Sequence, residues 1–201
     1  MNEVVKSIFE SEAEAIRNIP LQQGYVDVVE LIHEKVHVNG GKVIASGMGK
    51  AGQVANTIAT TFSSTGTPAI FLHPSEAQHG DLGVIRENDV LLVLSNSGKT
   101  REILELVFLA RQLHSGLPVV LLTGNKDGEL VEEANITLLT GKPQEVCPLG
   151  LTPTTSTTVM MVICDALTVL LMKKIDFKAV DYAKRHHGGY LGEKSRKTGK
   201  A

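Results

Sequence analysis

The sequence predicts an α/β fold in which a five-stranded parallel sheet lies between two layers of helices. From residue 41 onward, apolar runs of strand length alternate with segments that carry apolar residues at helical spacing. Short apolar strands that alternate with helices favour a parallel sheet covered on both faces. The loops that follow such strands are where an open sheet of this kind binds its ligands.

The expected elements follow one another without a repeat or a linker. Apolar side chains among acidic and small ones predict amphipathic helices at residues 3–17 and 26–36. The expected strands are 42–46, 69–72, 90–94, 118–122 and 136–139, with helices 51–64, 101–113 and 128–134 between them. After a loop over 140–153, a long apolar helix at 154–174 and a shorter one near 176–184 complete the pattern. This order predicts a three-layer α/β/α sandwich, doubly wound and flavodoxin-like, preceded by N-terminal helices.

Length and composition are those of one ordinary globular domain. The 201 residues are 42% hydrophobic and 21% charged, and the formal net charge is −2. We therefore expect a single domain over 1–201, with N-terminal helices at 3–36 and a C-terminal tail at 186–201. The charge argues against a nucleic-acid or membrane partner.

The cysteines and the N-terminus predict a cytoplasmic protein. Cys147 and Cys164 lack the spacing of a zinc site or redox pair, which indicates a reducing compartment without a disulfide. Residues 1–16 lack the basic start and apolar core of a signal peptide. The apolar segment 159–172 is interrupted by Asp165, and we expect it to be too short to cross a bilayer.

The turn Ser95-Asn96-Ser97-Gly98-Lys99-Thr100 is the leading candidate for a binding site. It joins an expected strand to an expected helix, where free N–H groups and the helix dipole attract an anion such as phosphate. The alternative is that its hydroxyl side chains only cap the helix. Three hydroxyls and one glycine in six residues are more than one cap requires.

Two other motifs have simpler readings. Residues 47–52 fit G-x-G-x-x-G, but the next strand ends at His73 without the acidic residue of a dinucleotide site. Residues 98–100 resemble the end of a Walker A loop, but the glycine required before Gly98-Lys99 is absent, which argues against a nucleotide triphosphatase. The glycines of 47–52 still predict a tight turn that holds Lys50 near an anion.

Three further segments carry groups that can do chemistry. His73, Glu76, His79 and Asp81 could ligate a metal, contact a sugar or line a polar loop. Glu145 stands between prolines beside apolar residues, so that partial burial would raise its pKa and suit it to act as a base, although it could also be a plain surface residue. Residues 185–190 contain two histidines and two glycines, which fits either a mobile closing segment or a frayed tail.

These motifs together resemble a known family. The residues concerned are Gly47-Met48-Gly49-Lys50, 63–68, His73-Pro74, 76–81, Ser95-Asn96-Ser97-Gly98, 145–150 and Pro153-Thr154-Thr155-Ser156. In the same order, over roughly residues 35–192, they look like the sugar isomerase (SIS) domain of D-arabinose 5-phosphate isomerases. The Ser-x-Ser-Gly loop is general for phosphosugar binding, whereas Glu-x-Cys-Pro-Leu-Gly and Glu-Ala-x-His-Gly-Asp are more specific. The resemblance implies an SIS core over about 35–180.

The resemblance also implies a reaction and a set of site residues. The activity would be an aldose–ketose isomerase that interconverts D-ribulose 5-phosphate and D-arabinose 5-phosphate through an enediol, toward Kdo, lipopolysaccharide or capsule synthesis. It implies no cofactor and a homotetramer built from dimers. The implied catalytic residues are Lys50, Glu102, Glu145 as base and His186 as acid/base. The expected substrate and phosphate contacts are Ser46, Gly47, Gly66, Thr67, His73, His79, Ser95, Asn96, Ser97, Thr100, Thr154, Thr155 and Ser156. No metal is expected to be required, and His73 is where an inhibitory zinc would bind.

The chain departs from the family pattern at three places. Longer members carry a pair of CBS modules after this domain, and we expect none here. Lys99-Thr100 replaces a commonly acidic position, and His187 replaces a proline, which leaves His186 and His187 as alternatives for one site position. A non-catalytic phosphosugar sensor and an isomerase of another phosphosugar are the competing functions. A sensor would not need all four catalytic residues, and we expect no DNA-binding segment before the domain.

Overall fold

The predicted parallel sheet is present in the computed structural model, which describes residues 1–198; residues 199–201 of the expected tail lie outside this range. The strands are β1 (Val43–Gly47), β2 (Ala69–Phe71), β3 (Val90–Leu94), β4 (Val119–Thr123) and β5 (Ile136–Leu139). All neighbours are parallel, and their order is β2-β1-β3-β4-β5. This is the doubly wound order that the sequence predicts.

The helices mostly agree with the predicted spans. In chain order they are α1 (Asn2–Arg17), α2 (Gly24–Ile32), α3 (Gly49–Ser64), α4 (Pro74–Ala77), α5 (Arg101–Leu113), α6 (Glu129–Glu133), α7 (Thr155–Lys174), α8 (Ala179–Ala183) and α9 (Gly189–Thr198). Two short elements lie outside the prediction, namely the helix α4 and a 3-10 turn, Asp81–Val84, in the expected polar loop. A π-helix, His33–Val38, continues α2 through the last part of the predicted helix 26–36. The expected tail contains α9, because Gly189, with φ of 69°, makes a turn that starts a new helix.

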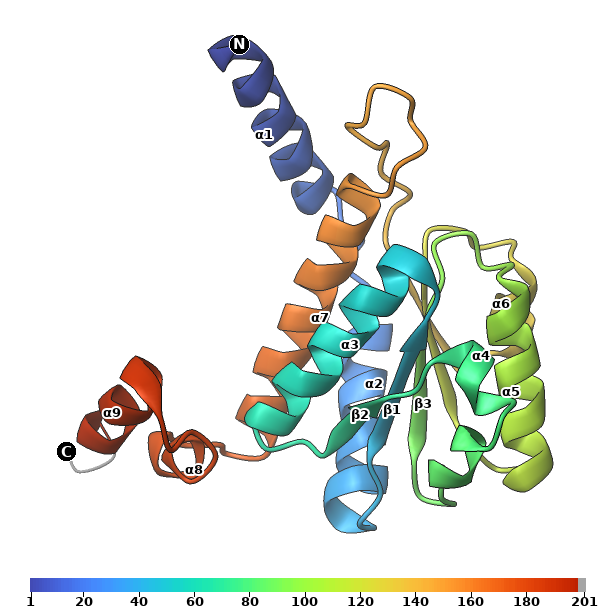
Figure 1. Ribbon diagram of the computed structural model, residues 1–201, viewed down its shortest axis with the longest axis vertical. Helices are drawn as coiled ribbons and strands as arrows, with labels where there is room; N and C mark the ends of the chain where they lie inside the picture. The colour runs from blue at the N-terminus through green and yellow to red at the C-terminus, as the bar shows by residue number, and fades with distance from the viewer. Residues whose placement is uncertain (199–201) are drawn as a thin grey trace.

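Helices cover both faces of the sheet (Figure 1), and alternate residues of β3 belong to different core clusters. Leu92 and Leu94 of β3 pack with side chains of α2, α3 and α7. Leu91 and Val93 pack with side chains of α4, α5 and α6. Burial on both faces explains the unbroken apolar runs of the sequence and confirms the three-layer α/β/α sandwich.

The first helix projects away from the sandwich (Figure 1). None of its residues is buried, and its apolar side chains Val4, Val5, Ile8 and Phe9 are exposed. The predicted amphipathic helix is therefore confirmed, while its apolar face is uncovered within the single chain.

The helix α7 corrects the expectation that the apolar segment is too short to cross a bilayer. It has 20 residues, and by length and composition it alone among the helices of residues 1–198 could span a membrane. Half of its apolar window is buried, and a core helix passes the same test. Its contacts with α2 and α3 place it in the core of the sandwich.

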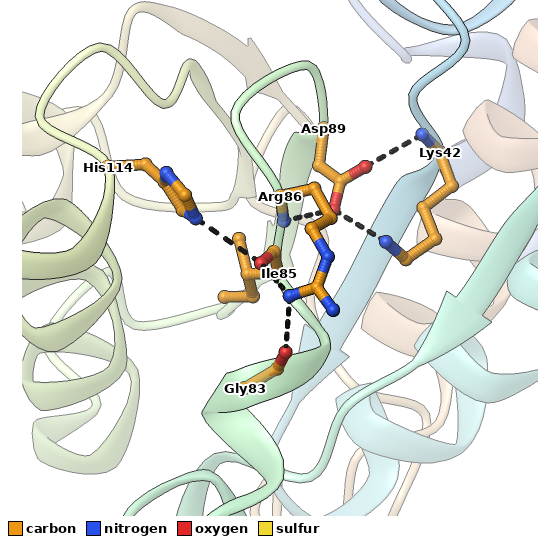
Figure 2. Close-up of polar contacts among 6 residues, drawn as sticks. All are labelled: Lys42, Gly83, Ile85, Arg86, Asp89 and His114. Atoms are coloured by element: carbon orange, nitrogen blue, oxygen red, sulfur yellow. Dashed lines mark hydrogen bonds and ion pairs between the residues drawn. The ribbon is translucent and has the colours of Figure 1, made fainter.

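A buried carboxylate joins the starts of two strands at the amino edge of the sheet. Asp89 is fully buried and accepts hydrogen bonds from the backbone N–H of Lys42 at 2.9 Å and of Arg86 at 2.7 Å. Its second contact to Lys42 is an ion pair, with Nζ to Oδ2 at 2.7 Å (Figure 2). Nearby, the Arg86 guanidinium donates to the carbonyls of Gly83 and Ile85. The carboxylate thus fixes the beginning of β1 against the loop that leads into β3.

Candidate functional site

Most of the predicted site residues gather at the carboxyl edge of the sheet, where β1 to β5 end. In Figure 1 the start of α3, the 140–153 loop and the start of α7 lie toward the same upper end of the molecule. Parallel strands place all their carboxyl ends at one edge, which is the usual ligand position in this fold. The residues that follow β1, β2 and β3 and those that begin α7 are thus brought to one end of the molecule.

The hydroxyl turn, residues 95–100, does not cap its helix. Thr100 is the N-cap residue of α5, but no side chain makes a capping hydrogen bond there. The Ser95 and Thr100 hydroxyl oxygens instead lie 2.7 Å apart, and the Ser97 hydroxyl accepts the N–H of Lys99 at 3.2 Å. The capping alternative is therefore wrong. The turn offers hydroxyl groups beside the positive end of the α5 dipole, as an anion site requires.

The loop after β4 holds this turn in place, and the sequence motifs did not single out its residues. Asn125 Nδ2 donates to the carbonyl of Ser97 at 2.8 Å, and Thr123 Oγ1 donates to the carbonyl of Asn96 at 3.3 Å. The N–H of Leu130 donates to the carbonyl of Gly98 at 3.0 Å. The sequence signal for this contact is Asn125, because it follows the strand next to the one that leads into the hydroxyl turn.

We expect Gly128→Ala to weaken anion binding by displacing the hydroxyl turn. A Cβ at Gly128 would lie 2.6 Å from the carbonyl oxygen and 2.7 Å from the Cα of Gly98, both backbone atoms that cannot rotate away. The expected result is about a tenfold higher Kd for inorganic phosphate in calorimetric titration, or about 1.4 kcal/mol. Gly116→Ala is the matched control, because its Cβ would meet nothing within 4 Å. An unchanged Kd in folded Gly128→Ala would contradict this support role.

The expected site residues at or after the ends of β1 and β3 differ in burial. Ser46 is fully buried and donates its hydroxyl to the carbonyl of Leu72 at 2.6 Å, so this hydroxyl joins strands rather than facing a ligand. Gly47 is also buried, at the end of β1. Lys50 is exposed in the first turn of α3, and it forms no ion pair with any residue in the described range 1–198. Glu102 is half-buried in the first turn of α5.

Glu145 is anchored at the N-terminus of α7 through one carboxylate oxygen. Its Oε2 accepts the N–H of Thr154 at 2.7 Å, the hydroxyl of Thr154 at 2.8 Å and the N–H of Ser156 at 3.3 Å. No hydrogen bond from the described part of the chain reaches Oε1. One oxygen is therefore held and the other is open.

The pKa of Glu145 differs from the sequence-based expectation. Burial acts to raise the pKa of this carboxyl, as expected, but hydrogen bonds from Ser156 and Thr154 outweigh burial and lower the pKa below its ordinary value. The expectation of a raised pKa is wrong, because the sequence does not show that the carboxylate accepts N–H groups at a helix N-terminus. Glu145 is consequently ionised at neutral pH.

The loop that carries Glu145 also contains a cysteine whose thiol pKa is lowered. Hydrogen bonds from Thr152, Leu151 and Leu149 to the sulfur lower the pKa of the Cys147 thiol to about 6. In contrast, burial raises the pKa of Cys164 to about 12. The N–H of Gly150 donates to the carbonyl of Cys147 at 2.8 Å, which closes a turn in the loop next to Glu145.

The first residues of α7 have different surroundings. Thr154 contacts Glu145, as described above, and Ser156 is buried. Thr155 is 1% exposed; its hydroxyl accepts the N–H of Val146 at 3.2 Å and donates to Glu12 Oε1 at 3.0 Å. Thr154, Thr155 and Ser156 were all expected to contact the substrate, but the Thr155 hydroxyl already bonds Val146 and Glu12.

The two histidines after β2 differ in exposure. His73 precedes α4, and its Nδ1 is buried without a hydrogen-bond partner in the described residues. His79 is exposed. Within residues 1–198 no three His, Cys, Asp or Glu side chains are grouped closely enough to hold a metal ion. That no metal is required stays a prediction.

Three expected site residues lie at the opposite end of the chain's own sheet. Gly66 and Thr67 follow α3 and precede β2, at the amino edge, where Gly66 packs against Phe177 and the Thr67 hydroxyl lies 3.1 Å from His37 Nε2. His186 lies between α8 and α9, two helices at the lower end of Figure 1, and its ring stacks on that of Tyr182 with 3.7 Å between centroids. His187 is exposed beside it. A single chain does not bring these groups to the hydroxyl turn.

Comparison with known proteins agrees with this architecture. The chain is 45% identical over 161 residues to the arabinose 5-phosphate isomerase KdsD of Shigella flexneri, a match that covers 80% of this chain and 48% of the relative. The chain thus spans about half the length of the curated relatives it matches.

Two solved structures match over nearly their whole length. A Bacteroides fragilis protein assigned as a phosphosugar isomerase involved in capsule formation is 57% identical, with a TM-score of 0.93, over 94% of this chain and 99% of that one. An Escherichia coli protein in complex with arabinose 5-phosphate is 30% identical, with a TM-score of 0.85, over 92% and 96%. Residues 37–170 match the SIS domain. With its sheet order and hydroxyl turn, the chain belongs to the SIS-domain family.

Proposed function

We propose that the protein is an aldose–ketose isomerase that interconverts D-ribulose 5-phosphate and D-arabinose 5-phosphate. The observation that carries this proposal is the arrangement of Glu145, whose Oε2 is fixed by α7 while Oε1 is open at the sheet edge that also carries the hydroxyl turn. An ionised carboxylate with one free oxygen is suited to act as a general base. The KdsD relatives and the neighbour bound to arabinose 5-phosphate support the choice of substrate.

The proposed reaction moves one proton between carbons and one between oxygens. Glu145 takes the proton from C1 of the ketose, and the C–H electrons form the C1=C2 bond of an enediolate with negative charge on O2. Lys50 stabilises this charge, and Glu102 orients the substrate or Lys50. His186 moves a proton from O1 to O2, after which Glu145 returns its proton to C2 and the aldehyde forms at C1. These reaction steps balance without an oxidant, a reductant or a cofactor.

The hydroxyl turn would hold the phosphate during this reaction. Ser95, Ser97 and Thr100 supply hydroxyl groups, and the first N–H groups of α5 have no side-chain cap. Lys99 adds an exposed positive charge next to them. Phosphate binding at a helix N-terminus needs this combination of N–H groups, hydroxyls and dipole.

The complete site would include a second copy of the chain. His186, Gly66 and Thr67 lie at the opposite end from the hydroxyl turn, so a neighbouring subunit is the natural source of these groups. The exposed apolar side chains of α1 and of α7, where Val169 and Leu170 are accessible, support subunit contacts. We therefore propose a cytoplasmic homotetramer built from dimers, whose mass light scattering would measure.

Conversion of ribulose 5-phosphate by purified protein tests the proposal. Proton NMR in D₂O should show arabinose 5-phosphate with deuterium at C2, because the proton that Glu145 takes from C1 exchanges with solvent before Glu145 protonates C2, and EDTA should leave the rate unchanged. Faster conversion of a different ketose phosphate would favour another substrate. Tight binding without conversion would contradict the isomerase and favour a phosphosugar sensor.

A further inference from the structure

We propose that Glu12 of α1 is a positioning residue that holds the Glu145 loop in its active arrangement. The proposal rests on the function of Glu145 given above and adds a residue that no sequence motif indicates. Glu12 lies outside residues 37–170, which match the SIS domain. It reaches the site because α1 passes the N-terminus of α7.

The link between the two carboxylates passes through one hydroxyl group. Thr155 accepts the N–H of Val146, the residue after Glu145, and donates to Glu12 Oε1. Both bonds use Thr155 Oγ1, and its residue is 1% exposed. A hydroxyl group has a single proton. When Glu12 accepts that proton from Thr155, the lone pairs of the Thr155 oxygen are left to accept the N–H of Val146.

Glu12 suits this task because its Oε1 accepts the hydroxyl proton of Thr155 at 3.0 Å. With Glu12 in place, the Thr155 proton points toward α1 and the oxygen lone pairs remain available to Val146. Without it, the hydroxyl proton has no fixed acceptor and can rotate toward the Val146 N–H, because Thr155 is the first residue of α7 and has no preceding helical turn to bond. The Val146 N–H would then lose a well-oriented acceptor, and the segment that carries Glu145 would loosen.

The burial of Glu12 argues against an incidental contact. The Oε2 atom is buried without a hydrogen-bond partner in the described residues, although α1 contains no buried residue. A carboxylate oxygen removed from water without a partner costs free energy. The bond from Thr155 and the positive end of the α7 dipole are the compensating interactions in the structure.

The test compares Glu12→Leu, which removes the acceptor, with Glu12→Gln, whose amide oxygen can still accept. We expect Glu12→Leu to lower kcat for the sugar phosphate about tenfold with KM changed less than about threefold, because substrate binding at the hydroxyl turn is untouched. Amide exchange of Val146 should become about tenfold faster in the same variant. Glu12→Gln should restore both values to within about threefold of the natural protein.

The controls separate this role from general damage to α1. Glu10→Leu makes the same change two residues away, at an exposed side chain whose recorded partner is Lys6, and should alter neither kcat nor Val146 exchange. Thr155→Val should reproduce Glu12→Leu, and the double variant should be no worse than Thr155→Val alone, since both changes break one chain of hydrogen bonds.

The readouts also separate failure of this inference from failure of the proposed function. If the natural protein does not convert the sugar phosphate, the isomerase proposal fails, while Val146 exchange in Glu12→Leu still decides whether Glu12 holds the loop. Unchanged Val146 exchange in Glu12→Leu would overturn the inference whatever the activity. The inference would also be overturned if the losses of kcat in Glu12→Leu and Thr155→Val multiplied in the double variant, because the two changes would then act independently.

Discussion

Glu145→Gln is expected to lower kcat for sugar phosphate isomerisation by about 10²- to 10⁴-fold, the usual contribution of a general base. The amide oxygen of Gln can still accept the N–H of Thr154 and of Ser156, which now bind Oε2. The loop should therefore keep its place while the proton acceptor is lost. Steady-state kinetics with ribulose 5-phosphate, together with calorimetric titration of arabinose 5-phosphate, would measure the two effects separately.

The matched control is Gln144→Ala, at the exposed preceding residue of the same loop, which should leave kcat within about twofold. Sugar phosphate affinity should stay within about threefold in Glu145→Gln, because the hydroxyl turn is unchanged. A variant that turns over at close to the natural rate would remove Glu145 from the role of base. Loss of affinity equal to the loss of kcat would instead assign Glu145 to binding.

The pH dependence of the natural enzyme gives an independent view of the same carboxyl. Because hydrogen bonds hold the folded pKa of Glu145 below its ordinary value of 4.5, its base form persists to a lower pH than that of a free glutamate. The stability that these bonds supply is present above pH 4.5 and is lost as the pH falls through the folded pKa. An acidic limb of kcat/KM assigned to Glu145 should therefore lie below pH 4.5, because kcat/KM reports the free enzyme, and Glu145→Gln should abolish it.

The fold could be predicted from the sequence because the spacing of apolar residues follows directly from which faces of the strands and helices are buried. Each strand of the sheet lies within one residue of its predicted ends, and β3 and α5 agree at both ends. A strand covered on both faces must be apolar throughout, so the pattern is strong. The α9 helix was missed because ten mostly polar residues after two glycines carry little signal, and α8 is its main neighbour.

The site could be predicted less fully, because residue types do not show where hydroxyl protons and N–H groups point. The hydroxyls of Ser95 and Thr100 pair with each other at the N-terminus of α5. Those of Ser46 and Thr155, which are the same residue types, bond other segments of the protein. The sign of the Glu145 pKa shift depends on the same kind of information. Glu12 was missed because its role requires that two segments separated by 143 positions meet.

Asp89→Ala is expected to destabilise the protein by about 3 kcal/mol, the largest effect on stability that we predict for a single side chain. The side chain of Asp89 is 1% exposed and carries three hydrogen bonds, two of them from backbone N–H groups (Figure 2). Removing it leaves the N–H groups of Lys42 and Arg86 without their acceptor, at about 1–3 kcal/mol for each that stays buried. Urea unfolding followed by circular dichroism would give the change as a lower midpoint with an unchanged slope.

The two backbone N–H bonds to Asp89, rather than its ion pair with Lys42, should account for most of the lost free energy of unfolding. The Lys42 side chain is 23% exposed, so its ammonium group can recover water when Asp89 is removed, whereas the two N–H groups lie at the starts of packed segments. Lys42→Met removes the ammonium but leaves both backbone N–H bonds to Asp89 in place, so it should cost less than Asp89→Ala. Glu87→Ala, at an exposed carboxylate two residues from Asp89, should change the free energy of unfolding by no more than about 0.5 kcal/mol. Equal losses for Lys42→Met and Asp89→Ala would reverse this ranking and give the ion pair the larger share.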